Sequence, residues 1–209
     1  MMRSQAVEST VRPLREGELP VASRLLAAAF ADDPFIGWFF RDRWRRRLAL
    51  PRFFGAVLYE LLPGGAVFAI EPDGVLAGVA AWTPPSVEPL SPVRARLSAL
   101  QVRAIFPRAA PRLRGGFATL AEYHPSFPHW YLAFVGIDPG AQRRGLGRAL
   151  LEPVLVEADA AGVACYLETP FPGTRSFYER LGYEETAELE PVRGAPRIWT
   201  MTRPAAAAR

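Results

Sequence analysis

Residues 142–148 read Q-R-R-G-L-G-R and open a predicted helix directly after a predicted strand. The first turn of a helix carries unpaired backbone N–H groups and the positive end of the helix dipole, and such a site binds phosphate oxygens. Gly145 and Gly147 would let a ligand approach the backbone with no Cβ in the way. Arg143 and Arg144 add positive charge. The pattern therefore predicts a pyrophosphate site.

The short pattern is weak evidence alone, because a glycine-rich helix start with solvated arginines gives the same letters. Its context strengthens the prediction, since an apolar strand at 129–137 precedes it and an amphipathic helix at 144–161 follows. The first glycine of G-x-G-x-x-G is missing, which argues against a dinucleotide-binding Rossmann fingerprint.

The composition excludes several other chemistries. All 25 basic residues are arginine, because the chain contains no lysine, so neither a Walker A lysine nor a pyridoxal-phosphate Schiff base is possible. With one cysteine, Cys165, and two histidines, His124 and His129, we expect no metal site. The net charge of +4 is weak evidence for nucleic-acid binding.

The chain has 209 residues, half of them apolar, which favours one packed domain over residues 1–209, ordered from about 10 to 203. No apolar run is long enough to span a bilayer, and the first ten residues lack the apolar core of a secretory signal. Together with the single cysteine, these features lead us to expect a cytoplasmic protein with no membrane partner.

Hydrophobic periodicity and turn residues predict alternating strands and helices. Strands are expected at 10–16, 66–71, 75–83, 129–137, 163–169, 183–190 and 196–202, and helices at 18–31, 43–62, 144–161 and 173–181, with two or three broken helices in 91–123. We expect Pro51 and Gly55 to interrupt the second helix, and Asp32-Asp33-Pro34 to end the first. Hairpins combined with one strand–helix–strand crossover predict a mixed α/β sheet of about seven strands flanked by helices.

Two runs in this order resemble a known family. The run W-Y-L-A-F-V-G-I-D-P-G-A-Q-R-R-G-L-G-R-A-L-L resembles motif A of the GCN5-related N-acetyltransferases (GNAT), and Y-L-E-T followed by S-F-Y-E-R-L-G-Y resembles motif B. Together they cover residues 129–183. Segments 27–34, 80–88 and 196–204 are similar to a subgroup that includes puromycin N-acetyltransferase. The resemblance implies a GNAT fold, splayed between its fourth and fifth strands, with acetyl-CoA as co-substrate.

The resemblance also implies roles for individual residues. Val135 and Ile137, with Gly136 between them, would bind the pantetheine arm, and the Ile137 N–H or its neighbour would stabilise the thioester oxyanion. Thr174 stands where the family often has an asparagine that bonds the pantetheine. The predicted pyrophosphate loop comprises Gln142, Arg143, Arg144, Gly145, Leu146, Gly147 and Arg148.

Tyr178, in F-Y-E-R, matches the general acid of the family, which protonates the departing thiolate. A general base is also required, because an alkylamine of pKa about 10.4 is only about one part in 2,500 neutral at pH 7. Glu122, His124 and Glu168 are the candidates, acting directly or through water. Trp82, Tyr123 and Trp130 could line an acceptor pocket, although aromatic residues in strands and loops usually serve packing.

These observations favour direct acetyl transfer to the primary amine of a small molecule, within a ternary complex of a monomer or homodimer. The subgroup resemblance suggests an aminonucleoside or a similar antibiotic as acceptor. Alternatives are a non-catalytic acyl-CoA-binding regulatory protein and acetylation of a protein or peptide amine. A third alternative, nucleic-acid binding by R-D-R-W-R-R-R at 41–47, is disfavoured because a solvated helix face explains that run more simply.

Overall fold

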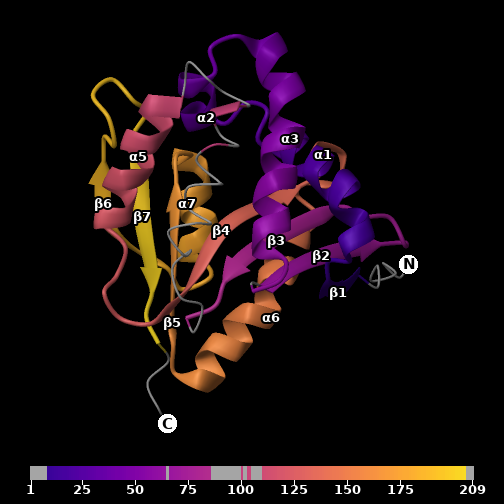
Figure 1. Cartoon of the computed structure of the whole chain (residues 1–209). Helices are drawn as coiled ribbons and strands as arrows, with labels where there is room; N and C mark the ends of the chain where they lie inside the picture. Colours follow the sequence, from indigo (N-terminus) through magenta and orange to yellow (C-terminus); the bar gives the residue numbers. More distant parts are fainter. Residues whose placement is uncertain (1–8, 65, 86–99, 101–102, 105–109, 206–209) are drawn as a thin grey trace.

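The computed structural model describes residues 9–64, 66–85, 100, 103–104 and 110–205 (Figure 1). The strands are β1 (Ser9–Pro13), β2 (Ala66–Pro72), β3 (Gly78–Thr83), β4 (His129–Ile137), β5 (Ala164–Thr169), β6 (Glu184–Leu189) and β7 (Ile198–Arg203). The helices are α1 (Leu19–Ala29), α2 (Pro34–Phe39), α3 (Arg43–Leu61), α5 (Ala110–Glu122), α6 (Leu146–Ala161) and α7 (Pro172–Glu179), with short 3₁₀ turns η1 (Glu16–Glu18) and η2 (Pro139–Ala141).

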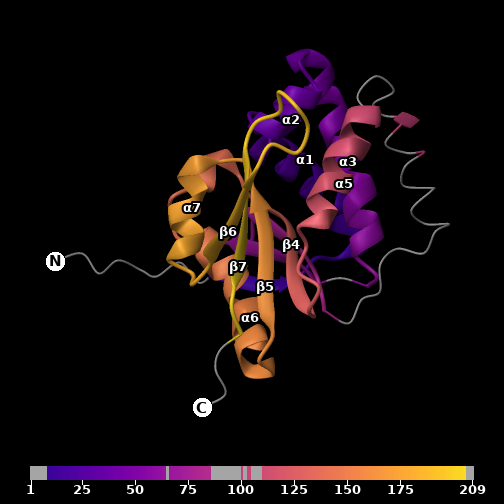
Figure 2. The same cartoon turned by 90° about the vertical axis from the view of Figure 1, so that its left-hand side faces the viewer.

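The strands form one mixed sheet in the order β1-β2-β3-β4-β5-β7-β6, which confirms the predicted seven-stranded sheet. The β4–β5 pair is parallel and the other neighbouring strands are antiparallel. Helices α1, α3 and α5 lie on one face, and α6 and α7 lie on the other (Figure 2). The crossover through α6 is what allows β4 and β5 to run parallel.

A β-bulge in β4 changes which side chains face each helical layer. The β3–β4 register pairs Ala81 with Phe134 but Trp82 with Leu132, so Ala133 is the extra residue. Leu132 packs in the hydrophobic cluster beneath α6, whereas Phe134, two residues later, packs against α1 and α3. The regular alternation of a strand would put both on one face.

Gly136 allows α1 to lie directly on β4. A Cβ at Gly136 would come within 2.8 Å of Leu26 Cδ2 and 2.9 Å of Ala29 Cβ, closer than a real Cβ contact. On the opposite face, the amphipathic helix α6 buries Leu150 and Leu151 against the sheet. The strand that leads to the predicted pyrophosphate loop is therefore held between two packed layers.

The structure differs from the expected helices in two places. Residues 34–39 form α2, because Asp33 caps it by accepting a hydrogen bond from Ile36 N at 2.7 Å and Pro34 occupies its first turn. Helix α3 runs through Pro51 without ending, with Phe54 and Leu58 fully buried on its inner face. Of the expected helices in 91–123, α5 lies in the described part, and most of the remainder lies outside it.

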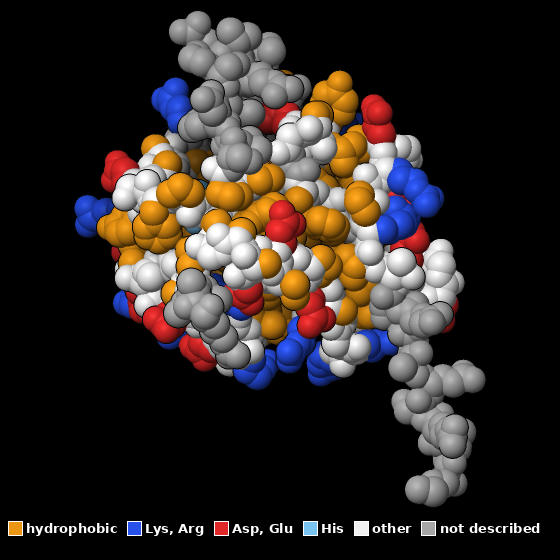
Figure 3. Space-filling view, turned by 90° about the horizontal axis from the view of Figure 1, so that it is seen from below, with side chains coloured by type: hydrophobic (Ala, Val, Ile, Leu, Met, Phe, Trp, Pro, Cys, Tyr) orange, Lys and Arg blue, Asp and Glu red, His pale blue; other side chains and the backbone are white. Residues whose placement is uncertain are grey.

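None of the described helices is long and apolar enough to cross a membrane. On the face shown in Figure 3, hydrophobic side chains form a band across the middle, and acidic and basic side chains surround it.

Candidate active site at the fork between β4 and β5

The strands β4 and β5 separate part-way along their length. Their parallel ladder runs from His129–Ala164 to Leu132–Leu167, and β4 then continues to Ile137 without pairing to β5. Glu168 and Thr169 of β5 keep only the pairing with β7 on the other edge of the strand. The predicted splay between the fourth and fifth strands is therefore confirmed, and we call this opening the fork.

Backbone groups of β4 face the fork. Asp138 N donates to Ala77 O at 2.8 Å, so in the antiparallel register Gly136 occupies the next hydrogen-bonded position, opposite Val79. The N–H and C=O groups of Val135 and Ile137 consequently point to the opposite edge of β4, which faces the fork. Peptide-like amides of a pantetheine arm could pair with this edge as an added strand does.

The turn after β4 prepares the start of α6. Asp138 Oδ1 accepts a hydrogen bond from Gly140 N at 2.9 Å, and Gln142 Nε2 donates to Ile137 O at 3.2 Å. Arg143 and Gly145 adopt left-handed conformations, with φ of 61° and 81°. The backbone N–H groups that follow open the 16-residue helix α6, whose N-cap, Gly145, supplies no side-chain hydrogen bond.

This turn fits a diphosphate. Gly145 is exposed, and a Cβ placed there would meet nothing within 4 Å. The side chains of Arg143, Arg144 and Arg148 are exposed, and within the described ranges none of them forms a salt bridge. Unpaired N–H groups, a helix dipole and three free guanidinium groups thus meet at the end of the fork.

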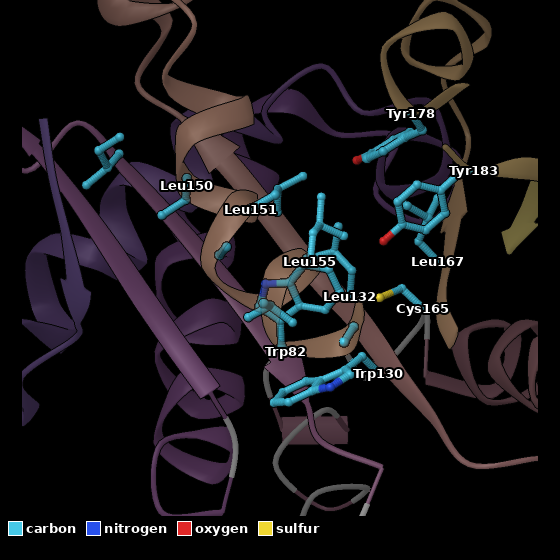
Figure 4. Packing of buried hydrophobic residues seen from close by; sticks show 14 of the residues in the cluster. Trp82, Trp130, Leu132, Leu150, Leu151, Leu155, Cys165, Leu167, Tyr178 and Tyr183 are labelled. Carbon is cyan, nitrogen blue, oxygen red and sulfur yellow. The ribbon is translucent and has the colours of Figure 1, made fainter. Parts of the chain in front are cut away.

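Tyr178 lies in α7, on the same side of the sheet as α6. Its ring packs in the hydrophobic cluster with Phe177 and Tyr183, at centroid distances of 5.1 and 5.8 Å. Figure 4 shows the Tyr178 ring extending from α7 with its hydroxyl pointing toward α6. Burial raises the pKa of Tyr178 above its ordinary value, so the phenol keeps its proton throughout the neutral range.

Thr174 is already engaged at the beginning of α7. Its hydroxyl donates to Phe171 O at 2.9 Å and lies 2.6 Å from the hydroxyl of Thr169. A hydroxyl has one proton, so Thr174 could accept a hydrogen bond from a ligand but not donate one. It can therefore replace only part of an asparagine amide.

On the opposite face of the sheet, Glu168 is the first residue of β5 beyond the ladder. Five side chains gather there, which we call the Glu168 cluster: His124, His129, Tyr131, Tyr166 and Glu168. The His124 ring lies 4.6 Å from that of Tyr131 and 4.7 Å from that of Tyr166. His124 Nε2 lies 3.0 Å from Glu168 Oε1, an ion-pair distance, although this oxygen accepts no hydrogen bond of favourable geometry.

The Glu168 carboxylate is unusually enclosed for a charged group. Its side chain is 9% exposed, whereas that of His124 is 31% exposed. Burial, and then the neighbouring carboxylate, raises the pKa of Tyr131 and of Tyr166, and burial lowers the pKa of His129. The Tyr166 hydroxyl is buried with no hydrogen-bond partner among the described residues. The cluster therefore contains two buried polar groups with unfilled hydrogen-bonding capacity.

The other candidate residues lie elsewhere. Glu122 and Tyr123 are exposed at the end of α5. The prediction that Trp82 and Trp130 line an acceptor pocket is not supported. Both are buried in the cluster beneath α6, their rings 6.4 Å apart, on the opposite face from Glu168 (Figure 4).

Sequence reasoning missed Tyr131 and Tyr166. They are directly opposite each other in the parallel ladder. The signal was the alternation of polar and apolar residues in H-W-Y-L and Y-L-E-T, which puts His129, Tyr131, Tyr166 and Glu168 on one face once the two strands are aligned.

Comparison with known proteins identifies this arrangement. Residues 114–183 match the model of the acetyltransferase (GNAT) family, and this range includes β4, the fork, α6, β5 and α7. This segment of the chain is similar to the acetyltransferase domain of the GNAT family. Within the described residues, no group of three or more His, Cys, Asp or Glu side chains could hold a metal ion.

Relatives outside the family model agree with this assignment. Mycothiol acetyltransferase of Clavibacter michiganensis is 36% identical over 63 residues, 30% of this chain and 21% of that protein, so the match spans about a fifth of the relative. An uncharacterized N-acetyltransferase of Schizosaccharomyces pombe is 25% identical over 174 residues, 78% of this chain and 69% of the relative. A structure titled histone acetyltransferase HPA2 and related acetyltransferase, from Corynebacterium glutamicum, superposes with a TM-score of 0.75 at 26% identity, covering 96% of this chain and 98% of the other. Each of these relatives is named or titled as an acetyltransferase.

Proposed function

We propose that the protein transfers the acetyl group of acetyl-CoA to a primary amine of a small molecule, by direct attack within a ternary complex. The observation that carries this proposal is the fork. It exposes backbone of β4 between a helix N-terminus on one side and a buried carboxylate on the other. A thioester held along β4 would lie between these two groups.

The cofactor side holds the co-substrate through local backbone. Val135 and Ile137 offer N–H and C=O groups to the pantetheine arm, and Gly136 keeps this edge in place by admitting α1. Gln142 to Arg148 offer N–H groups and guanidinium charge to the diphosphate. Leu146 and Gly147 contribute backbone, and Leu146 also anchors the turn in the core.

The Glu168 cluster supplies the base. The amine nitrogen forms a bond to the thioester carbonyl carbon and loses a proton, which Glu168 accepts. His124 lies 3.0 Å from Glu168 and is partly exposed, so it can pass this proton to solvent. The two candidates thus act as one relay instead of as alternatives, with His124 as its outer member.

Tyr178 supplies the acid. The bond between carbon and sulfur breaks, and the phenol of Tyr178 donates a hydrogen bond to the departing thiolate. Since burial raises the pKa of Tyr178, complete transfer to the thiolate is uphill by more than the roughly 2 kcal/mol expected of an ordinary phenol. A positioned hydrogen bond that strengthens as sulfur becomes negative supplies the stabilisation without complete transfer.

An aminonucleoside is the first acceptor to examine. The reason is the similarity to the puromycin N-acetyltransferase subgroup, which is carried by segments 27–34, 80–88 and 196–204. Amine acceptors of other kinds are represented among proteins of similar fold. One of them, from Escherichia coli, is titled ribosomal-protein-S18-alanine N-acetyltransferase, with 19% identity and a TM-score of 0.58.

The test combines calorimetry with a thiol-release assay. Acetyl-CoA should bind the purified protein, and addition of puromycin or simple primary amines should release CoA faster than hydrolysis does, with acetylated amine detected by mass spectrometry. Binding of acetyl-CoA without release of CoA to any amine would contradict the proposal and favour a non-catalytic acyl-CoA-binding protein.

A further inference from the structure

The Glu168 cluster is one carboxylate enclosed by aromatic rings. Two tyrosines and two histidines surround Glu168, with ring centroids 4.6 to 6.2 Å from their aromatic neighbours. In addition to burial, Glu168 raises the pKa values of Tyr131 and Tyr166, whereas His124 lowers and Glu168 raises the pKa of His129. Glu168 is therefore the one acidic side chain of the cluster.

A buried carboxylate without a good partner is costly, and a cation relieves that cost. Here the side chain of Glu168 is more than nine-tenths buried, and its Oε1 accepts no well-formed hydrogen bond from any described residue. Aromatic faces attract cations as well, through the quadrupole of the ring. Both features favour a ligand that carries positive charge where it meets the fork.

From this arrangement we propose that the acceptor is an amine with no carboxylate on the carbon next to the nitrogen, and that the Glu168 cluster excludes free α-amino acids by charge. The inference rests on the proposed function, since it concerns the acceptor of that reaction. The ammonium group is bound by Glu168 and the face of Tyr131 before it loses a proton. A carboxylate on the adjacent carbon would then lie roughly 5 Å from Glu168, where repulsion at an effective dielectric constant of about 20 corresponds to roughly 100-fold in affinity.

Equilibrium binding tests this selection independently of turnover. The protein is saturated with CoA and titrated with phenethylamine, L-phenylalaninamide and L-phenylalanine, then with tryptamine, L-tryptophanamide and L-tryptophan. In at least one series the amine and the amide should bind at least tenfold more tightly than the acid. The amide has the shape of the amino acid without its negative charge, so it separates charge from size.

Three results would overturn the proposal. These are equal or tighter binding of the acid, exclusion of the amide together with the acid, and failure of every probe to bind the CoA complex. None of them depends on acetyl transfer. Failure of the proposed function would instead appear as acetyl-CoA that binds but releases no CoA.

Two sets of substitutions test whether Glu168 and Tyr131 cause the preference for amines over α-amino acids. Glu168→Gln should reduce the ratio of amine to acid affinity to within about threefold, because the carboxylate is lost while the shape is kept. Tyr131→Leu should weaken amine binding more than Tyr131→Phe, which retains the aromatic face. An unchanged ratio in Glu168→Gln, with CoA affinity intact, would overturn the assignment.

Discussion

The two sides of the fork are built in different ways. The cofactor side is one continuous stretch, from Val135 to Arg148, and most of its binding groups are backbone N–H and C=O. The acceptor side is composed of side chains from three segments: the end of α5, the paired part of β4, and β5.

This difference shows how one fold can keep its co-substrate and change its acceptor. Backbone groups at a strand edge and a helix start persist when side chains change, so the cofactor side tolerates substitution outside its glycines. Each contact in the Glu168 cluster depends on residue type, so one substitution can alter acceptor or rate. The predictions below test whether the two sides can be disabled separately.

The largest effect is expected from Glu168→Gln. It removes the proton acceptor but keeps the shape, so turnover with a good amine should fall by about 10²–10⁴-fold. The affinity for acetyl-CoA should stay within about twofold, because Glu168 faces the acceptor side. Steady-state rates of CoA release give the turnover, and calorimetry gives the affinity for acetyl-CoA. A parallel loss of turnover and of acetyl-CoA affinity would mean that the cofactor side and the acceptor side cannot be disabled separately.

Tyr178→Phe should also lower turnover at unchanged acetyl-CoA affinity, because the hydroxyl matters mainly as sulfur becomes negative. In the wild type, burial raises the pKa of Tyr178, so the acid stays protonated as pH rises. The rate should therefore increase with pH as the amine deprotonates, with no falling limb below about pH 10. A Phe variant with wild-type kcat, under conditions where chemistry limits the rate, would show that Tyr178 only packs.

Gly145→Glu should disable the cofactor side. The new carboxylate would stand where the diphosphate approaches, and acetyl-CoA affinity should fall roughly 30- to 100-fold, corresponding to about 2–3 kcal/mol. Gly145→Ala is the matched control, since it imposes the same left-handed strain at φ 81° without charge. Equal losses in the two variants would attribute the effect to backbone strain and remove the evidence for a phosphate site.

The sequence could predict the strand, turn and helix start of the proposed cofactor side because its signals are local. Glycines, arginines and a strand-to-helix transition lie within a few residues of one another, and the residue order alone specifies their contacts. The acceptor side depends on the bulge at Ala133 and on the register that sets Tyr131 beside Tyr166. Neither can be derived from a periodicity of two, which is why Glu168 and His124 remained separate candidates and Tyr131 and Tyr166 were not singled out.

A smaller effect concerns stability away from both sides of the fork. Burial raises the pKa of Asp33, the cap of α2, to about 6. A carboxyl whose folded pKa exceeds its unfolded value of 3.8 stabilises the fold below pH 3.8, and this contribution is lost as pH rises to about 6. Between pH 4 and pH 8, the free energy of unfolding of Asp33→Asn should therefore gain about 2 kcal/mol relative to wild type.

Denaturant unfolding at the two pH values measures this change. Asp42→Asn is the control, because Asp42 also caps a helix, α3, but is exposed. The same pH-dependent gain in both variants would show that capping, and not burial of the charge, is the cause.

The smallest effect on activity is expected from Trp130→Phe. The indole is buried beneath α6, away from the Glu168 cluster, so the substitution should cost about 1–2 kcal/mol of stability. The KM for the amine should stay within about twofold of wild type. A large increase in the KM for the amine in a folded variant would show that Trp130 does line the acceptor pocket.

The most direct measurement of the central claim is amide hydrogen exchange along β4, followed by NMR with and without acetyl-CoA. If the arm of acetyl-CoA pairs with the open edge, the amides of Val135 and Ile137 should become protected on binding. The amide of Asp138, already bonded to Ala77 O, should change little. Saturating acetyl-CoA that leaves Val135 and Ile137 as exchangeable as in the free protein would contradict the account.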